Sequence, residues 1–199
     1  RTVEDRLVHS LHAYFLRRGD VNAPIVFEVD RSRDGGSFTS RRVVAIQHGQ
    51  PILTLSASFH GDEPGLDHQT PMPEAPAPAT LRDLSAIHAE VFGGTADITH
   101  AMLQARRPFE FRPVREPEYF KPVPAPPRKQ MWMRAAGRVR DDQPLHRCLL
   151  TYASDYDLLS TAMQPHGVSF PHVQIASIDH ALWFHRDVRV DDWLLYDIE

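Results

Sequence analysis

The stretch that decides the fold is HSLHAYFLRRGDVNAPIVFEVD, residues 9–30, because the chain carries a second version of it. Moving the sequence along itself by 169 residues places residues 178–199, IDHALWFHRDVRVDDWLLYDIE, opposite the first version without a gap. Phe15 then faces Phe184, and the final six positions of each version, IVFEVD and LLYDIE, are conservative pairs throughout. Because internal repeats determine architecture, the sequence predicts a duplicated fold.

The residues around the first copy predict antiparallel β-structure. Strands are expected over residues 8–16, 25–30, 38–46 and 52–59, since apolar residues alternate with polar ones or form short apolar runs there. Two turns separate the later strands. One is Arg33-Asp-Gly-Gly36, in which the glycines are expected to supply positive φ angles, and the other is His48-Gly-Gln-Pro51. We expect this half of the chain to form an antiparallel meander.

The remaining residues predict helices, strands and one linker. The segment 61–78, rich in proline and acidic residues, is expected to be a loop, and Pro122–Pro127 (PVPAPP) an extended linker that marks a domain boundary. Helices are predicted over residues 80–91, with Thr80 as the cap, and over residues 145–163, ended by Gln164-Pro-His-Gly167. Further strands are predicted over residues 109–114, 131–139, 175–186 and 193–199.

A helix followed by a long antiparallel sheet, present twice, is the layout of a hotdog fold, in which the sheet wraps around the helix. We therefore predict an α+β tandem (double) hotdog, with the first unit over residues 1–75, a connecting segment over 76–129 and the second unit over 130–199. Only the first copy continues into two further strands, and only the second is preceded by a helix. Both ends of the duplication are thus expected to be clipped in this chain.

Composition narrows the range of functions. The chain has 199 residues and a net charge of −4, so no basic excess is available to neutralise the phosphates of a nucleic acid. No apolar run approaches the length of a membrane span, and the N-terminal residues do not resemble a signal peptide. A single cysteine, Cys148, excludes a disulfide within the chain and fits a reducing cytoplasm.

The run ASIDHALWFHR, residues 176–186, contains the main candidate for chemistry. It reads as a buried strand, yet it carries Asp179 and His180, and aspartate disfavours strands and is rarely buried without a partner. Neighbouring strand residues point to opposite faces, so the two cannot face one site. Asp179 is therefore either a functional acid or a strand-edge residue satisfied by backbone amides, and His180 is expected to be structural.

Other motifs predict no metal site and no cradle for a nucleotide phosphate. The acidic and histidine-rich run HGDEPGLDH, residues 60–68, is expected to be a solvated loop, because its flanking prolines give no rigid scaffold for ligands. The chain lacks GxSxG, HExxH, GxGxxG and GxxxxGK[ST] motifs. Cys148, inside the predicted helix 145–163, is expected to be a small core residue.

Three runs resemble the acyl-CoA thioesterase II family of bacteria and peroxisomes: LVHSLHAYFLRRGD (7–20), FTSRRVVAIQHGQPILTLSASF (38–59) and IASIDHALWFHR (175–186). The resemblance covers nearly the whole chain and is weakest in residues 61–78. It implies a double hotdog enzyme that hydrolyses fatty acyl-CoA to free acid and CoA without a metal or organic cofactor. It also implies that two such molecules associate, so we expect a homodimer.

The resemblance further implies a catalytic trio of Asp, Thr or Ser, and Gln that orients one water. The Asp belongs to the I-D-H run and is Asp179 here, while the other two positions are expected beyond Glu199, so a protein ending at Glu199 is expected to be inactive. The repeat partner of Asp179 is Ser10, so only one of the two related sites is expected to be active. Arg41-Arg42 and Arg106-Arg107 could contact CoA phosphates, although solvated faces are the preferred interpretation.

Two alternatives stay open at this point. One is a hotdog enoyl-CoA hydratase, which also uses an acid and a histidine on CoA thioesters. The other is a non-catalytic module that binds acyl-CoA or supports assembly. A glutamine near the end of the last strand would favour hydrolysis.

Overall fold

The computed structural model describes residues 2–92, 108–168 and 173–199. The chain forms two compact units: Arg1–His68 with Gln143–Thr151 and Ala176–Val188, and Gln69–Asp142 with Tyr152–Ile175 and Arg189–Glu199. Each unit therefore combines segments that are distant in sequence. The run Pro122–Pro127 contains no helix or strand and lies inside the second unit. The division into residues 1–75, 76–129 and 130–199 stays a prediction.

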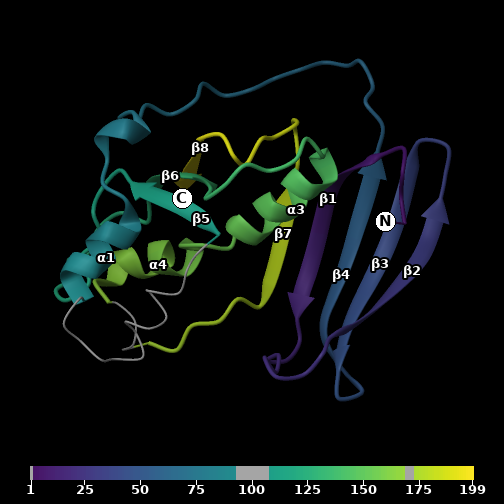
Figure 1. Ribbon diagram of the computed structural model, residues 1–199, viewed down its shortest axis with the longest axis horizontal. Coiled ribbons are helices and arrows are strands. Elements are labelled where there is room, and N and C mark those ends of the chain that lie inside the picture. The colour runs from purple at the N-terminus through teal and green to yellow at the C-terminus, as the bar shows by residue number, and fades with distance from the viewer. Residues whose placement is uncertain (1, 93–107, 169–172) are drawn as a thin grey trace. The chain divides into compact units, whose positions relative to one another are not determined.

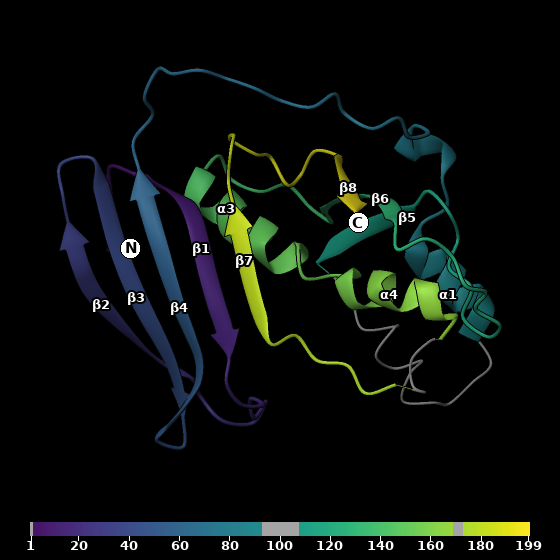
Figure 2. The same cartoon turned by 180° about the vertical axis from the view of Figure 1, so that it is seen from behind.

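The first unit contains a five-stranded antiparallel sheet in the order β2-β3-β4-β1-β7 (Figures 1 and 2). Its strands are β1 (Leu7–Phe15), β2 (Val26–Asp34), β3 (Phe38–Gln47), β4 (Gln50–His60) and β7 (Asp179–Trp183). The predicted strands are confirmed, although β7 is shorter than the predicted residues 175–186. The predicted meander is wrong for β1, which pairs with β4 instead of β2.

The connection from β1 to β2 explains this pairing. It runs past the ends of β4 and β3, and Gln47 at the end of β3 anchors it. The buried Gln47 amide accepts a hydrogen bond from the Asp20 backbone N–H and donates to the carbonyls of Asp20 and Ala23, each at 2.8 Å. A buried side-chain amide that is satisfied in this way fixes the path of a loop.

The tight turn between β3 and β4 contains the positive φ angles of this sheet. Gln47 pairs with Gln50, and the two residues between them, His48 and Gly49, have φ angles of 50° and 71°. Positive φ at both central positions is typical of the type I′ turn that matches strand twist. The prediction that the glycines of Arg33–Gly36 supply positive φ is wrong, because that connection is longer and closes through the Gly35 N–H and the Phe38 carbonyl.

We expect Gly49→Ala to lower the free energy of unfolding by about 1 kcal/mol, the cost of a left-handed conformation for a residue with a Cβ. A Cβ at Gly49 would meet nothing within 4 Å, so no clash contributes. Gly36→Ala is the matched control, since its Cβ is equally unobstructed and its φ is not positive. Urea unfolding of both variants checks the prediction, and equal stabilities would contradict it.

The predicted helix 145–163 is two helices, α3 (Gln143–Ala153) and α4 (Leu158–Met163). The break occurs at Asp157, whose φ of 65° cannot continue a right-handed helix. The Asp157 carboxylate accepts hydrogen bonds from Lys129 at 2.9 Å and Ser160 at 2.7 Å. These contacts, which come partly from a distant strand, hold the break in place.

The second unit has a three-stranded antiparallel sheet in the order β5-β6-β8. The strands of this sheet are β5 (Phe109–Pro113), β6 (Lys129–Ala135) and β8 (Leu194–Ile198). The unit also contains α1 (Leu84–Phe92) and the short 3₁₀ turns η1 (Pro78–Thr80) and η2 (Gln164–His166). The core residues of this unit include Ile87, Phe111, Met131, Ala153 and Val190. No helix within the described residues is long and apolar enough to cross a membrane.

The predicted cap of the first helix is wrong. Thr80 ends η1, and its hydroxyl donates to the Ala77 carbonyl. α1 begins four residues later, and the Asp83 carboxylate accepts the backbone N–H of Ser85 at 2.8 Å. Aspartate before the first helical turn satisfies an N–H that has no partner within the helix, so Asp83 is the cap.

The repeat appears in the first sheet as a pair of strands. β1 and β7 occupy equivalent positions in the two copies, and they pair antiparallel with His12 opposite Ala181. These two residues are 169 positions apart, so each faces its own equivalent. Equivalent strands that pair in this manner are related by a local twofold axis, as expected for a duplicated fold.

Candidate active site

Asp179 is the first residue of β7 and lies on an open face of the sheet. Its backbone pairs with Tyr14 of β1, and half of its side chain is exposed. The carboxylate oxygen Oδ2 lies 2.8 Å from His12 Nε2. Among the described residues, the hydrogen-bond partner of this carboxylate is therefore a side chain. The alternative interpretation, a strand-edge aspartate satisfied by backbone amides, required a different partner.

His180 lies on the opposite face of the sheet. It pairs with Ala13, whose side chain is buried, while Asp179 and Ala181 alternate with it along the strand. The regular register between Ser10–Tyr14 and Asp179–Trp183 thus separates the acid from its neighbouring histidine. A structural role for His180 stays a prediction.

The histidine that contacts Asp179 is His12, which the sequence did not identify. His12 and Asp179 are 167 residues apart, and no local pattern of the sequence indicates a diagonal contact between their two strands. The imidazole also lies against the ring of Tyr14, with ring centres 4.5 Å apart. Its side chain is 42% exposed, so solvent reaches the pair.

A second histidine of β1 lies at a bulge. The register of β1 against β4 shifts between Val8 and Ser10, which makes His9 the extra residue. Its Nε2 lies 2.9 Å from the Ser58 hydroxyl. Burial lowers the pKa of His9, and the positive charges of His60 and Arg147 lower it further. His9 is therefore a neutral hydrogen-bonding residue at neutral pH.

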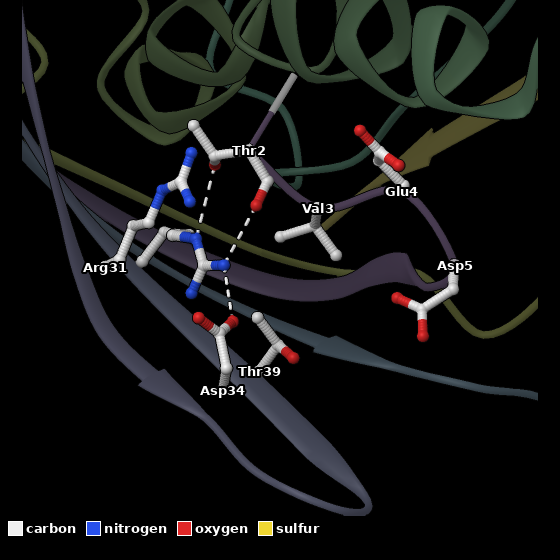
Figure 3. A pocket seen from close by; sticks show the side chains of 8 residues that line it. Thr2, Val3, Glu4, Asp5, Arg31, Asp34 and Thr39 are labelled. Carbon is white, nitrogen blue, oxygen red and sulfur yellow. Dashed lines mark hydrogen bonds and ion pairs between the residues drawn. The ribbon is translucent and has the colours of Figure 1, made fainter.

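A pocket of about 260 Å³ near the N-terminus is lined by residues that include Thr2, Asp34 and Thr39 (Figure 3). Arg41 also lines it and has a structural role. Arg41 is 5% exposed, and its guanidinium donates to Thr2, to Asp34 and to the carbonyls of Arg33 and Ser40. The expectation that Arg41 lies on a solvated face is wrong, because these acceptors hold it inside. Arg42 is exposed, and Arg106-Arg107 lies outside the described residues.

The remaining candidates from the sequence are the acidic and histidine-rich run 60–68 and Cys148. In residues 2–92, 108–168 and 173–199, no three His, Cys, Asp or Glu side chains are placed to hold a metal ion. Within the run 60–68, His60 contacts Glu63 at 3.4 Å and Asp67 contacts Arg186 at 2.9 Å. Cys148 is exposed on α3, so the expectation of a core residue is wrong.

The geometry of the Asp179–His12 pair allows Asp179 to act as a base. An ionised carboxylate only accepts hydrogen bonds, so the short contact requires a proton on His12 Nε2. With Oδ2 engaged, Oδ1 remains to accept a proton from a water molecule. A carboxylate that is exposed and aimed by one donor can act as a general base.

Two family profiles match the chain. The profile described as acyl-CoA thioesterase matches residues 98–199, and the one described as acyl-CoA thioesterase N-terminal domain matches residues 1–60. Human acyl-coenzyme A thioesterase 8 is 37% identical over 98% of this chain and 64% of its own length. Acyl-CoA thioesterase 2 of Haemophilus influenzae is 36% identical over 98% of this chain and 69% of its own. The chain thus spans about two thirds of these relatives.

Solved structures agree with the sequence relatives. The acyl-CoA thioesterase II TesB2 of Mycobacterium marinum is 40% identical, with a TM-score of 0.76 over 98% of this chain and 69% of that one. A protein with a hot dog fold from Alicyclobacillus acidocaldarius is 18% identical, with a TM-score of 0.63 over 90% of this chain and 60% of that one. The latter likeness concerns the fold alone and confirms the predicted α+β hotdog class. Together with the profile that matches residues 98–199, these relatives show that the chain belongs to the acyl-CoA thioesterase family.

Proposed function

We propose that the protein hydrolyses fatty acyl-CoA thioesters to a free fatty acid and CoA, with Asp179 as the general base. The observation that carries this proposal is the placement of Asp179. It lies in the I-D-H run of a segment that matches the acyl-CoA thioesterase profile, on an open sheet face, with one carboxylate oxygen held by His12. No metal or organic cofactor takes part.

The reaction needs one positioned water molecule. Asp179 Oδ1 accepts a proton from this water while the oxygen of the water attacks the thioester carbonyl carbon. The tetrahedral intermediate then collapses, the C–S bond breaks, and the CoA thiolate leaves and is protonated. Thiolate is a good leaving group, so the main tasks of the protein are to orient the water and to stabilise the developing oxyanion. The resemblance to the acyl-CoA thioesterase II family implies that a Thr or Ser and a Gln orient this water together with Asp179.

The experiment that tests this function follows thiol release from acyl-CoAs of increasing chain length, using the protein with its natural ends. Release of one free thiol and one fatty acid per substrate is the expected result. Formation of a hydrated acyl-CoA without free thiol would support the hydratase, and binding without turnover would support the non-catalytic module. The relatives reported above are named thioesterases, so the comparisons do not favour either alternative.

We also propose a cytoplasmic homodimer that participates in fatty acid metabolism. The single cysteine of the chain suits a reducing compartment. The resemblance to the acyl-CoA thioesterase II family supports the dimer. A mass determined by light scattering for the protein in solution tests the assembly, and the mass of a single chain would overturn it.

A further inference from the structure

We propose that His12 is the positioning residue of the Asp179 site, and that the site is therefore built from both copies of the repeat. This inference rests on the proposed thioesterase function and deepens it. The observation behind it is the 2.8 Å contact from His12 Nε2, in the first copy, to Asp179 Oδ2, in the second. His12 holds the carboxylate in one orientation, so that its other oxygen faces the attacking water.

The asymmetry of the two repeat copies supports a paired role. The twofold relation that matches β1 with β7 generates two equivalent diagonal positions on one sheet face. One holds Asp179 and His12. The other holds their equivalents, Ser10 and Ala181, neither of which can act as a base or as a charged partner. Acid and histidine are therefore present together at one position and absent together from the other.

The surroundings of His12 favour this orienting role over a structural one. Its side chain is 42% exposed, so it contributes little to a core, and its ring packs against Tyr14 on the same strand. The charged side chain that contacts the imidazole is Asp179. Since the carboxylate only accepts hydrogen bonds, His12 Nε2 donates, and replacement of His12 by an apolar residue leaves Asp179 free to rotate.

The test compares His12→Leu with His12→Gln in the protein with its natural ends. His12→Leu removes the donor, and we expect kcat to fall about 10- to 100-fold, the range for one hydrogen bond to a charged group. KM is expected to stay within about twofold, because the role proposed for His12 is to orient Asp179 and not to bind the substrate. His12→Gln keeps an N–H donor at the same reach and should retain kcat within about threefold.

A comparison of His12→Leu in the parent and in the Asp179→Asn variant distinguishes a positioning role of His12 from a structural one. His12→Leu should have almost no effect on the residual activity of Asp179→Asn, because no base remains to be oriented. An equal loss in both backgrounds, or an unchanged kcat in His12→Leu, overturns the inference while leaving the thioesterase function intact. A parent protein without thioester turnover overturns the function itself.

The matched control is His48→Asn. His48 makes the same kind of contact with an exposed aspartate, Nε2 to Asp20 at 3.1 Å, at the turn between β3 and β4. Asparagine tolerates the positive φ of this position. We expect His48→Asn to leave kcat unchanged, and a loss equal to that of His12→Leu would overturn the inference.

Discussion

Asp179→Asn is expected to lower kcat for acyl-CoA hydrolysis by about 10²- to 10⁴-fold, the usual contribution of a general base. Asparagine has the same shape as aspartate, and its amide oxygen can still accept the N–H of His12. What it loses is the capacity to take a proton from water. KM should change little, since the carboxylate acts on the water and not on the thioester. Thiol release under saturating substrate measures the loss.

Asp20→Asn is the matched control for this variant. Asp20 is also paired with a histidine, His48, and it also accepts a backbone N–H, from Asn22, which lowers its pKa. It lies in the connection from β1 to β2 and takes no part in the proposed chemistry. A thioesterase activity that survives Asp179→Asn at the parent level would remove Asp179 as the base.

Arg147→Met is expected to lower the free energy of unfolding by about 2–3 kcal/mol, because it leaves the part-buried Val8 carbonyl without its side-chain donor. Arg147 on α3 has a side chain that is 7% exposed. Its guanidinium donates to the Val8 carbonyl of β1 and to the Asp187 carboxylate at 2.8 Å, and it lies over the ring of Phe184. One side chain thus joins α3 to β1 and to the segment that follows β7.

Most of this loss should come from the Val8 carbonyl, because the Asp187 side chain is 62% exposed and its attraction is screened by water. Urea unfolding measures the effect as a shift of the midpoint at constant slope. Arg186→Met is the control, since Arg186 pairs with Asp67 at an exposed position and should cost less than about 1 kcal/mol. If Arg147→Met were as stable as the parent, apolar packing would replace the buried interactions fully, as it does at some buried ion pairs.

Local sequence patterns predicted the strands and the tight turn, because the relevant forces act between near neighbours. Alternation placed β1, β3 and β4, and the dipeptide His48-Gly49 supplied the positive φ angles of the turn. The order of strands was not predicted correctly. β1 pairs with β4 because Gln47 holds a distant loop, and such a contact has no local signature.

The helix break shows a second limit of the sequence. The apolar spacing of residues 145–163 continues across Asp157, so periodicity predicted one helix. The left-handed conformation of Asp157 is stabilised by Lys129, which comes from a strand 28 residues earlier. A side chain from another element therefore overrides the local preference.

Sequence reasoning identified one of the two residues of the candidate site. Asp179 stood out because an acid in an apolar strand needs a compensating partner or a use. Its partner His12 could be found only once the pairing of β1 with β7 was known, since alternation alone makes His12 one polar residue among several. The repeat does contain a usable signal in retrospect, namely that the equivalents of His12 and Asp179 in the other copy are Ala181 and Ser10, which are neither histidine nor acid.

The most direct test of the central claim, that Asp179 activates water for attack on the thioester, is a single turnover in H₂¹⁸O with enzyme in excess over acyl-CoA. Mass spectrometry of the fatty acid shows the origin of its new oxygen. The account predicts that the acid carries one ¹⁸O atom, because the water attacks the thioester carbonyl directly. An acid without ¹⁸O would mean that the Asp179 carboxylate itself attacks and gives up its oxygen, which would contradict a base role.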